Sequence, residues 1–212
     1  MNGLFDESTP DCVRDVAAAL AEWSYDLPIP TDDPRCLGFI LEQSMALFLR
    51  EALPEYTVEL SGATDYPNIH LWREGGPSVA FEVKASSKTT GIGNRVKSPE
   101  SIVSVYDHYD GHWVLAIFYG VAADGLHLRD LRLCVLPLWQ YASTTFKDMS
   151  AISALGSLAA MLRDSPSDRA FRSEREFLSF VRYMSGRSGT TADRNAMARE
   201  WLAINRSRPA DS

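Results

Sequence analysis

Glu82 and Lys84 are the two residues of this chain whose types and spacing fit catalysis best. They lie two positions apart in the run VAFEVK, residues 79–84. Side chains alternate between the two faces of a strand, so both project from one side while Phe81 and Val83 project from the other into a core. A carboxylate beside an ammonium on an apolar strand suits a divalent cation and a water molecule directed at a phosphodiester.

A second strand is expected immediately before this one. The run YPNIHLW, residues 66–72, is followed by a Gly-Gly pair at 75–76. Two short apolar runs joined by such a turn predict a β-hairpin. If the apolar residues of both strands face the core, Asn68 shares the face of Glu82 and Lys84.

The hairpin, its charged pair and the Gly/Ser/Thr/Lys-rich segment after it resemble the PD-(D/E)xK nuclease superfamily, which includes most type II restriction endonucleases. The resemblance covers roughly residues 36–121: a helix with a glutamate, the hairpin, then a helix and a buried strand. It implies an α/β fold in which helices flank a mixed central β-sheet. It also implies Mg²⁺-dependent hydrolysis of double-stranded DNA at a specific site by a homodimer, as part of a restriction-modification system.

The family pattern carries over onto individual residues of the hairpin. It makes Glu82 the second acidic metal ligand and Lys84 the motif lysine, which would orient or help to deprotonate the attacking water. Asn68 stands where the first acid is usual, and its amide oxygen would bind Mg²⁺ without contributing charge. Two explanations stay open. The ligand is naturally shifted to Asp65, although in a regular strand Asp65 would point to the face opposite Asn68, or an engineered Asp-to-Asn substitution traps a substrate complex. The fit of the surrounding motif favours the second.

Glu42 is a further candidate for the catalytic set. It lies on a predicted helix, roughly residues 36–53, that is apolar nearly all round and therefore largely buried. Its neighbours on the same helical face, Gly38, Ala46 and Leu49, are nonpolar, which is an unfavourable environment for a solvated carboxylate. Related nucleases often have a helix glutamate near the metals, so the resemblance adds Glu42 to the site; the alternative is a salt bridge to a nearby arginine.

The charge of the chain is unevenly distributed. The net charge of −7 argues against a polyanionic partner, and residues 1–60 contain twelve acidic side chains and three arginines. Residues 83–99 contain no acid, and their glycines, hydroxyls and amides suit contact with phosphates and base edges. We therefore expect this segment to bind DNA through Lys88, Asn94, Arg95 and Lys97. A plain solvated loop is the alternative, and the arginine-rich C-terminal helices are a second candidate surface.

The predicted elements run in the order helices, sheet, helices, which favours one domain over residues 1–212. The core would span about 36–140 and a helical C-terminal part about 150–206. Helices are expected from about Thr9, over 36–53, from Ser98, and over about 151–163, 174–184 and 191–205. Strands are expected near 56–60, 68–72, 79–84 and 112–121 and within 126–136.

The cysteines and the hydropathy of the chain indicate where the protein is located and which partners to expect. Cys12, Cys36 and Cys134 are odd in number and widely spaced, so neither disulfides nor a zinc site are expected and the cytoplasm is the predicted location. No apolar run approaches a membrane span, so no membrane partner is expected. Two alternatives to a restriction enzyme stay open: a repair or structure-specific nuclease of the same fold, and a catalytically silent nuclease-like DNA-binding module, which Asn68 would explain directly.

Overall fold

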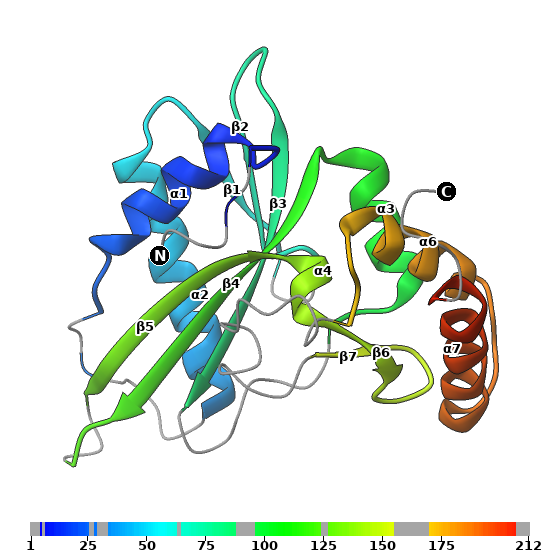
Figure 1. The fold of residues 1–212 in the computed structure, drawn as a ribbon. Helices are drawn as coiled ribbons and strands as arrows, with labels where there is room; N and C mark the ends of the chain where they lie inside the picture. Colours follow the sequence, from blue (N-terminus) through cyan, green and yellow to red (C-terminus); the bar gives the residue numbers. More distant parts are fainter. Residues whose placement is uncertain are drawn as a thin grey trace. The chain divides into compact units, whose positions relative to one another are not determined.

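The computed structural model describes residues 5, 7–25, 28, 34–62, 65–87, 96–123, 127–154 and 170–206. A five-stranded mixed sheet, ordered β1-β2-β3-β4-β5, is combined with helices (Figure 1), which is the predicted α/β architecture. The chain divides into two compact units. The first consists of Met1–Gly93 and His108–Leu138, and the second of Asn94–Asp107 and Trp139–Ser212.

In its described residues, the first unit contains the five-stranded sheet and the helices α1 and α2. Its elements are α1 (Asp11–Ala21), α2 (Pro34–Ala52), β1 (Thr57–Leu60), β2 (Ile69–Trp72), β3 (Ser78–Ser87), β4 (Gly111–Val121) and β5 (Leu128–Pro137). All neighbouring strands are antiparallel except β3 and β4, which are parallel. A parallel pair needs a crossover connection, which here includes α3 (Pro99–His108).

The predicted hairpin is formed by β2 and β3. Ile69 pairs with Phe81 and Trp72 with Ser78, and Gly75 in the turn has a φ of 69°, which glycine adopts without steric cost. Alternation along the strands places one apolar set in the core, as predicted, and residues of α1 and α2 belong to the same core. This core comprises, among others, Ile69, Leu71, Phe81, Val83, Leu115, Ile117, Leu41, Met45 and Leu49.

Helix α2 packs on this core through one face only. Leu37, Leu41, Met45 and Leu49 recur every four residues and are buried, whereas Phe39 and Leu47 are exposed. The expectation of a helix buried nearly all round is therefore too broad, because the sheet covers one side of it.

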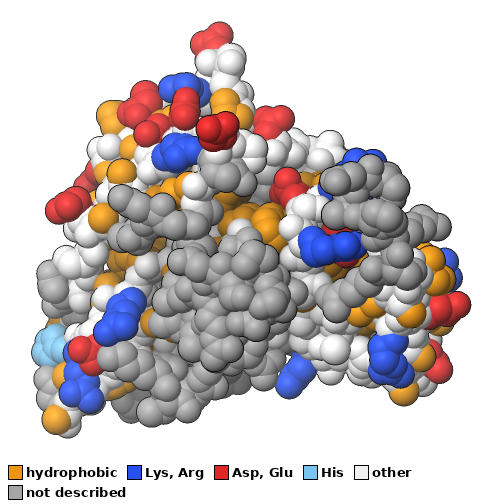
Figure 2. Space-filling model, in the orientation of Figure 1, with side chains coloured by type: hydrophobic (Ala, Val, Ile, Leu, Met, Phe, Trp, Pro, Cys, Tyr) orange, Lys and Arg blue, Asp and Glu red, His pale blue; other side chains and the backbone are white. Residues whose placement is uncertain are grey.

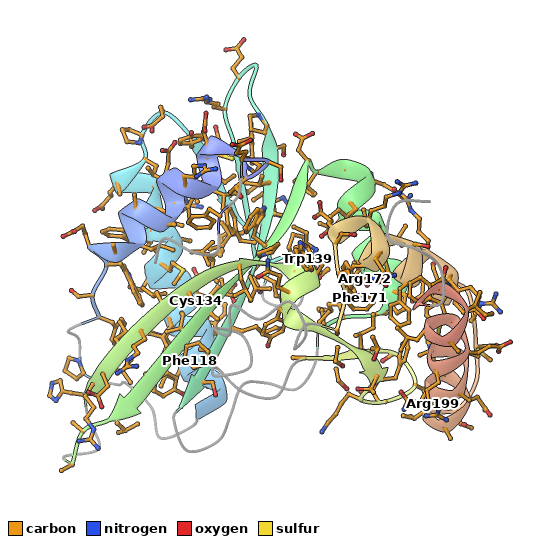
Figure 3. The ribbon with its side chains drawn as sticks, in the orientation of Figure 1. Phe118, Cys134, Trp139, Phe171, Arg172 and Arg199 are labelled. Atoms are coloured by element: carbon orange, nitrogen blue, oxygen red, sulfur yellow. The ribbon has the colours of Figure 1, made fainter. Side chains whose placement is uncertain are left out.

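The second unit combines a short hairpin with helices. Its elements are α3, most of α4 (Leu138–Tyr141), β6 (Ala142–Phe146), β7 (Ile152–Ala154), α6 (Glu174–Met184) and α7 (Thr191–Arg206). Helix α6 begins as predicted, where the Ser173 side chain accepts a hydrogen bond from Glu176 N–H. Phe171, labelled in Figure 3, packs on Phe177 and Phe180 with ring centroids 5.1 and 5.2 Å apart.

The helix predicted over residues 151–163 is wrong at its start, where Ile152–Ala154 forms strand β7. Ile152 N–H donates to the Lys97 carbonyl, and Val96 N–H donates to the Ile152 carbonyl, so extended pairing replaces helical hydrogen bonds. Ile152 and Ala154 are buried and the residue between them is half-buried, which is a period of two. Residues 155–163 lie outside the described part of the chain.

Candidate active site

Strand β3 presents the predicted charged pair. Glu82 is buried, and the Lys84 ammonium donates to Glu82 Oε1 over 2.5 Å. The lysine side chain keeps 20 % of its surface exposed, against 4 % for the glutamate. The pair thus joins a buried carboxylate to a cation that reaches solvent, which offsets the cost of burying the negative charge.

Asn68 joins this pair from the residue before β2. Continuing the β2–β3 register past Ile69 would set Asn68 opposite Glu82 and Pro67 opposite Val83. The chain leaves the sheet at this point, and the Val83 N–H donates instead to Asn68 Oδ1 over 2.8 Å. A side-chain amide thus replaces a backbone acceptor and is fixed beside the charged pair.

Glu42 reaches the same group of side chains from α2. It is 8 % exposed, and its pKa is raised to about 7, first by burial and then by the negative charge of Glu82. The Lys84 charge and a hydrogen bond with the Asn68 side chain oppose that rise. Because Asn68 Oδ1 already accepts from Val83, its amide N–H is the group that donates to Glu42. The structure therefore brings together Glu42, Asn68, Glu82 and Lys84, the four residues predicted to be catalytic.

Other predicted residues lie apart from this cluster or beyond the description. Asp65 is exposed, and its carboxylate turns back to accept a hydrogen bond from Gly62 N–H over 3.2 Å. Lys97 is half-buried in the second unit, where its carbonyl accepts from Ile152 N–H. The remaining DNA-binding candidates, Lys88, Asn94 and Arg95, lie outside the described residues.

Comparison with known proteins supports the architecture. No protein-family model and no curated protein sequence matches the chain. Among solved structures, it is similar to the NlaIV restriction endonuclease, with 14 % identity and a TM-score of 0.54 over 95 % of this chain and 89 % of that chain. The fold is restriction-endonuclease-like. At this identity the likeness shows the fold alone. In the part of the chain that the structure describes, no helix is long and apolar enough to cross a membrane.

Two polar residues that sequence reasoning did not select lie beside the charged pair. His112 is fully buried on β4, and its ring meets that of Tyr66 edge-on with centroids 5.1 Å apart. Burial and then the positive charge of Lys84 lower the pKa of His112 to about 3. Burial and then the negative charge of Glu82 raise the pKa of Tyr66 well above its ordinary value. The sequence carries no signal for this meeting, because it depends on the register of β3 against β4.

His70, on strand β2, forms a separate hydrogen-bonded group. Its Nε2 lies 3.0 Å from Ser61 Oγ, and its Nδ1 lies 2.5 Å from the Tyr109 hydroxyl. Burial lowers the pKa of His70, and a negative charge on Glu59 opposes the shift. A half-buried imidazole with both nitrogens engaged is suited to join β2 to the segment after α3 rather than to exchange protons with a substrate.

The side chains at the cluster fit the expected Mg²⁺. Within the described residues no group of three or more acidic, histidine or cysteine side chains is arranged to hold a metal. Glu42 and Glu82 nonetheless supply two carboxylates close enough for one to raise the pKa of the other. Mg²⁺ is usually held by one or two carboxylates with water completing the shell, and a cation between these two would relieve their repulsion. Asn68 Oδ1 is already engaged by Val83 N–H, so the amide is better placed to position Glu42 than to replace a charged ligand.

Proposed function

We propose that this protein is a Mg²⁺-dependent endonuclease of the PD-(D/E)xK type that cuts double-stranded DNA at a specific sequence. One observation carries the proposal: Glu42, Asn68, Glu82 and Lys84 converge from α2, the residue before β2, and β3 on a restriction-endonuclease-like fold. A homodimer acting on a two-fold symmetric site is the assembly that such an enzyme would use.

Each residue of the cluster has a distinct part in the proposed reaction. Glu82 and Glu42 would hold the cation, which when bound supplies Lewis acidity toward the scissile phosphate. Lys84 binds Glu82 Oε1 and is partly exposed, so its ammonium would orient the attacking water and offset charge developing on the phosphate. Asn68 holds Glu42 and the β3 backbone in one arrangement. Burial of both carboxylates keeps bulk water from competing for them.

The surface charge of the first unit bears on where DNA would approach. Figure 2 shows acidic side chains, with basic ones among them, over one end of this unit, around the β2–β3 turn and α1, where Glu74, Glu7 and Asp11 are exposed. Lys84 lies toward the other end of β3, away from that turn. This separation supports access of a polyanion to the cluster despite the net negative charge.

A silent nuclease-like DNA-binding module is the second candidate, and the contacts of Asn68 favour it. Both ends of the amide are used, the oxygen by Val83 N–H and the nitrogen by Glu42. An asparagine with these two partners stabilises the site while removing one anionic ligand. A protein that had lost cleavage but kept its fold would need such a residue at this position.

The test compares the parent protein, Asn68→Asp and Asn68→Asp/Glu82→Ala on plasmid DNA with Mg²⁺. We expect discrete fragments from the parent or the Asn68→Asp form, and none once Glu82 is replaced. Smears or structure-dependent nicks would instead indicate a repair-type nuclease of the same fold. Absence of cleavage by both the parent and Asn68→Asp, with DNA binding intact, would overturn the enzyme assignment and favour the silent module.

A further inference from the structure

A buried histidine–tyrosine pair lies one step along the sheet from the Glu82–Lys84 pair. In the parallel register of β3 and β4, Ala80 pairs with His112 and Lys84 with Ala116. Residues paired across a sheet point to the same face, so His112 shares the face of Glu82 and Lys84. On this face Ala80 lies between His112, its partner on β4, and Glu82, the next residue of β3 to point the same way. Its side chain is a single methyl group, so a large ring can lie beside it.

Tyr66 fills the space next to His112. The two rings meet at an interplanar angle of 66°, the edge-to-face arrangement that aromatic quadrupoles favour. Tyr66 also begins the Tyr66-Pro67-Asn68 segment, so it ties the residue that holds Glu42 to strand β4. His112 is inaccessible to solvent and the Tyr66 hydroxyl is buried, so their dipoles act in a medium of low dielectric constant, where they are strong.

The two members of the buried pair lie on the same face of the sheet as the charged pair and within electrostatic reach of it. The charge of Glu82 acts on the Tyr66 hydroxyl, and the charge of Lys84 acts on the His112 ring. A neutral imidazole adds no second cation beside the ammonium. The buried pair therefore supplies oriented dipoles without changing the net charge of the cluster.

We propose that Tyr66 and His112 are positioning residues that hold Glu82 and Lys84 in the arrangement that binds a divalent cation. This inference rests on the proposed function and deepens it by adding groups that touch neither substrate nor metal. Outer groups that orient ligating side chains typically contribute about tenfold or more to metal affinity.

The test uses Tyr66→Phe, which removes one oxygen atom and keeps the ring, with Tyr109→Phe as matched control. Tyr109 meets His70 edge-on in the same way, with centroids 4.8 Å apart, but its hydroxyl feels the charge of Glu59 instead of Glu82. Two quantities are measured in each protein: the affinity for Ca²⁺ by titration calorimetry, and the ¹³C NMR signal of the Lys84 ε-carbon, assigned by its loss in Lys84→Arg.

We expect Tyr66→Phe to weaken Ca²⁺ binding by about tenfold and to move the Lys84 signal, while Tyr109→Phe changes neither. An unmoved Lys84 signal in Tyr66→Phe, or equal shifts in both variants, would overturn the inference. Failure of both the parent and Asn68→Asp to bind Ca²⁺ would count against the proposed metal-dependent function instead, and the Lys84 signal would still decide the positioning role.

Discussion

His112 should give this protein a specific sensitivity to acid. The ring is fully buried, and its pKa is lowered from 6.5 to about 3 in the fold, chiefly by burial and further by Lys84. A histidine with a depressed folded pKa binds its proton more readily in the unfolded chain. Its effect on stability is therefore nil above pH 6.5, grows as the pH falls, and is complete near pH 3.

The size of this effect follows from the two pKa values. Each pH unit below 6.5 costs about 1.4 kcal/mol, so at about pH 4.5 the free energy of unfolding should be lower by about 3 kcal/mol. His112→Phe keeps a ring against Tyr66 and cannot take up a proton. Its slightly larger ring should cost about 1–3 kcal/mol, equally at every pH.

The assay is urea denaturation of the parent and His112→Phe at about pH 7.5 and about pH 4.5. Relative to the parent, the variant should gain about 3 kcal/mol on going to the lower pH. Replacing His127, which is exposed, with Gln is the control. If the difference between parent and His112→Phe is the same at both pH values, His112 is not a buried neutral histidine and the reasoning about its surroundings is wrong.

Three further predictions concern cleavage and binding. Lys84→Ala should reduce the rate of DNA cleavage by ~10²–10³-fold or more, because a positioned charge is lost; a near-parental rate would refute the assignment. Asn68→Asp should cut faster at a given Mg²⁺ concentration, since an anionic oxygen suits a hard cation better than an amide; identical Mg²⁺ curves would leave Glu42 and Glu82 as the carboxylates that hold the cation, with position 68 in a positioning role. Arg95→Ala and Lys97→Ala should each flatten the log-log salt dependence of DNA binding by roughly one unit if they hold phosphates, or relax specificity at one position by ~1–3 kcal/mol if they read a base. No change in either quantity would move the DNA surface to the arginine-rich C-terminal helices.

Local periodicity was enough to predict the hairpin and the direction of its side chains. The alternation of apolar residues, read with the Gly-Gly turn, predicts that Phe81 and Val83 face the core while Glu82 and Lys84 share the opposite face, and the structure agrees. A strand has a side-chain period of two, so a buried face excludes a one-residue slip in the pairing of β2 with β3, and the length of the turn then sets the register. Helix α6 could also be predicted from the sequence, because its cap and its apolar spacing are both local signals.

The sequence alone was weaker where two distant segments meet. Strand β7 looked helical because a short apolar run fits either period. Its pairing with β6 and with the chain at Val96 and Lys97 selects the extended form. The partial exposure of α2 likewise depends on which side the sheet covers.

The candidate site divides in the same way between local sequence and tertiary structure. Glu82, Lys84 and Asn68 follow from the pattern of one hairpin. Glu42 entered by resemblance, and only the packing of α2 on the sheet brings it close enough to Glu82 for its pKa to rise. Tyr66 and His112 meet because a crossover sets β4 parallel to β3 in one register. Side-chain direction along a strand is a property of the local backbone, whereas distance between strands and helices is determined by the packing of the whole unit.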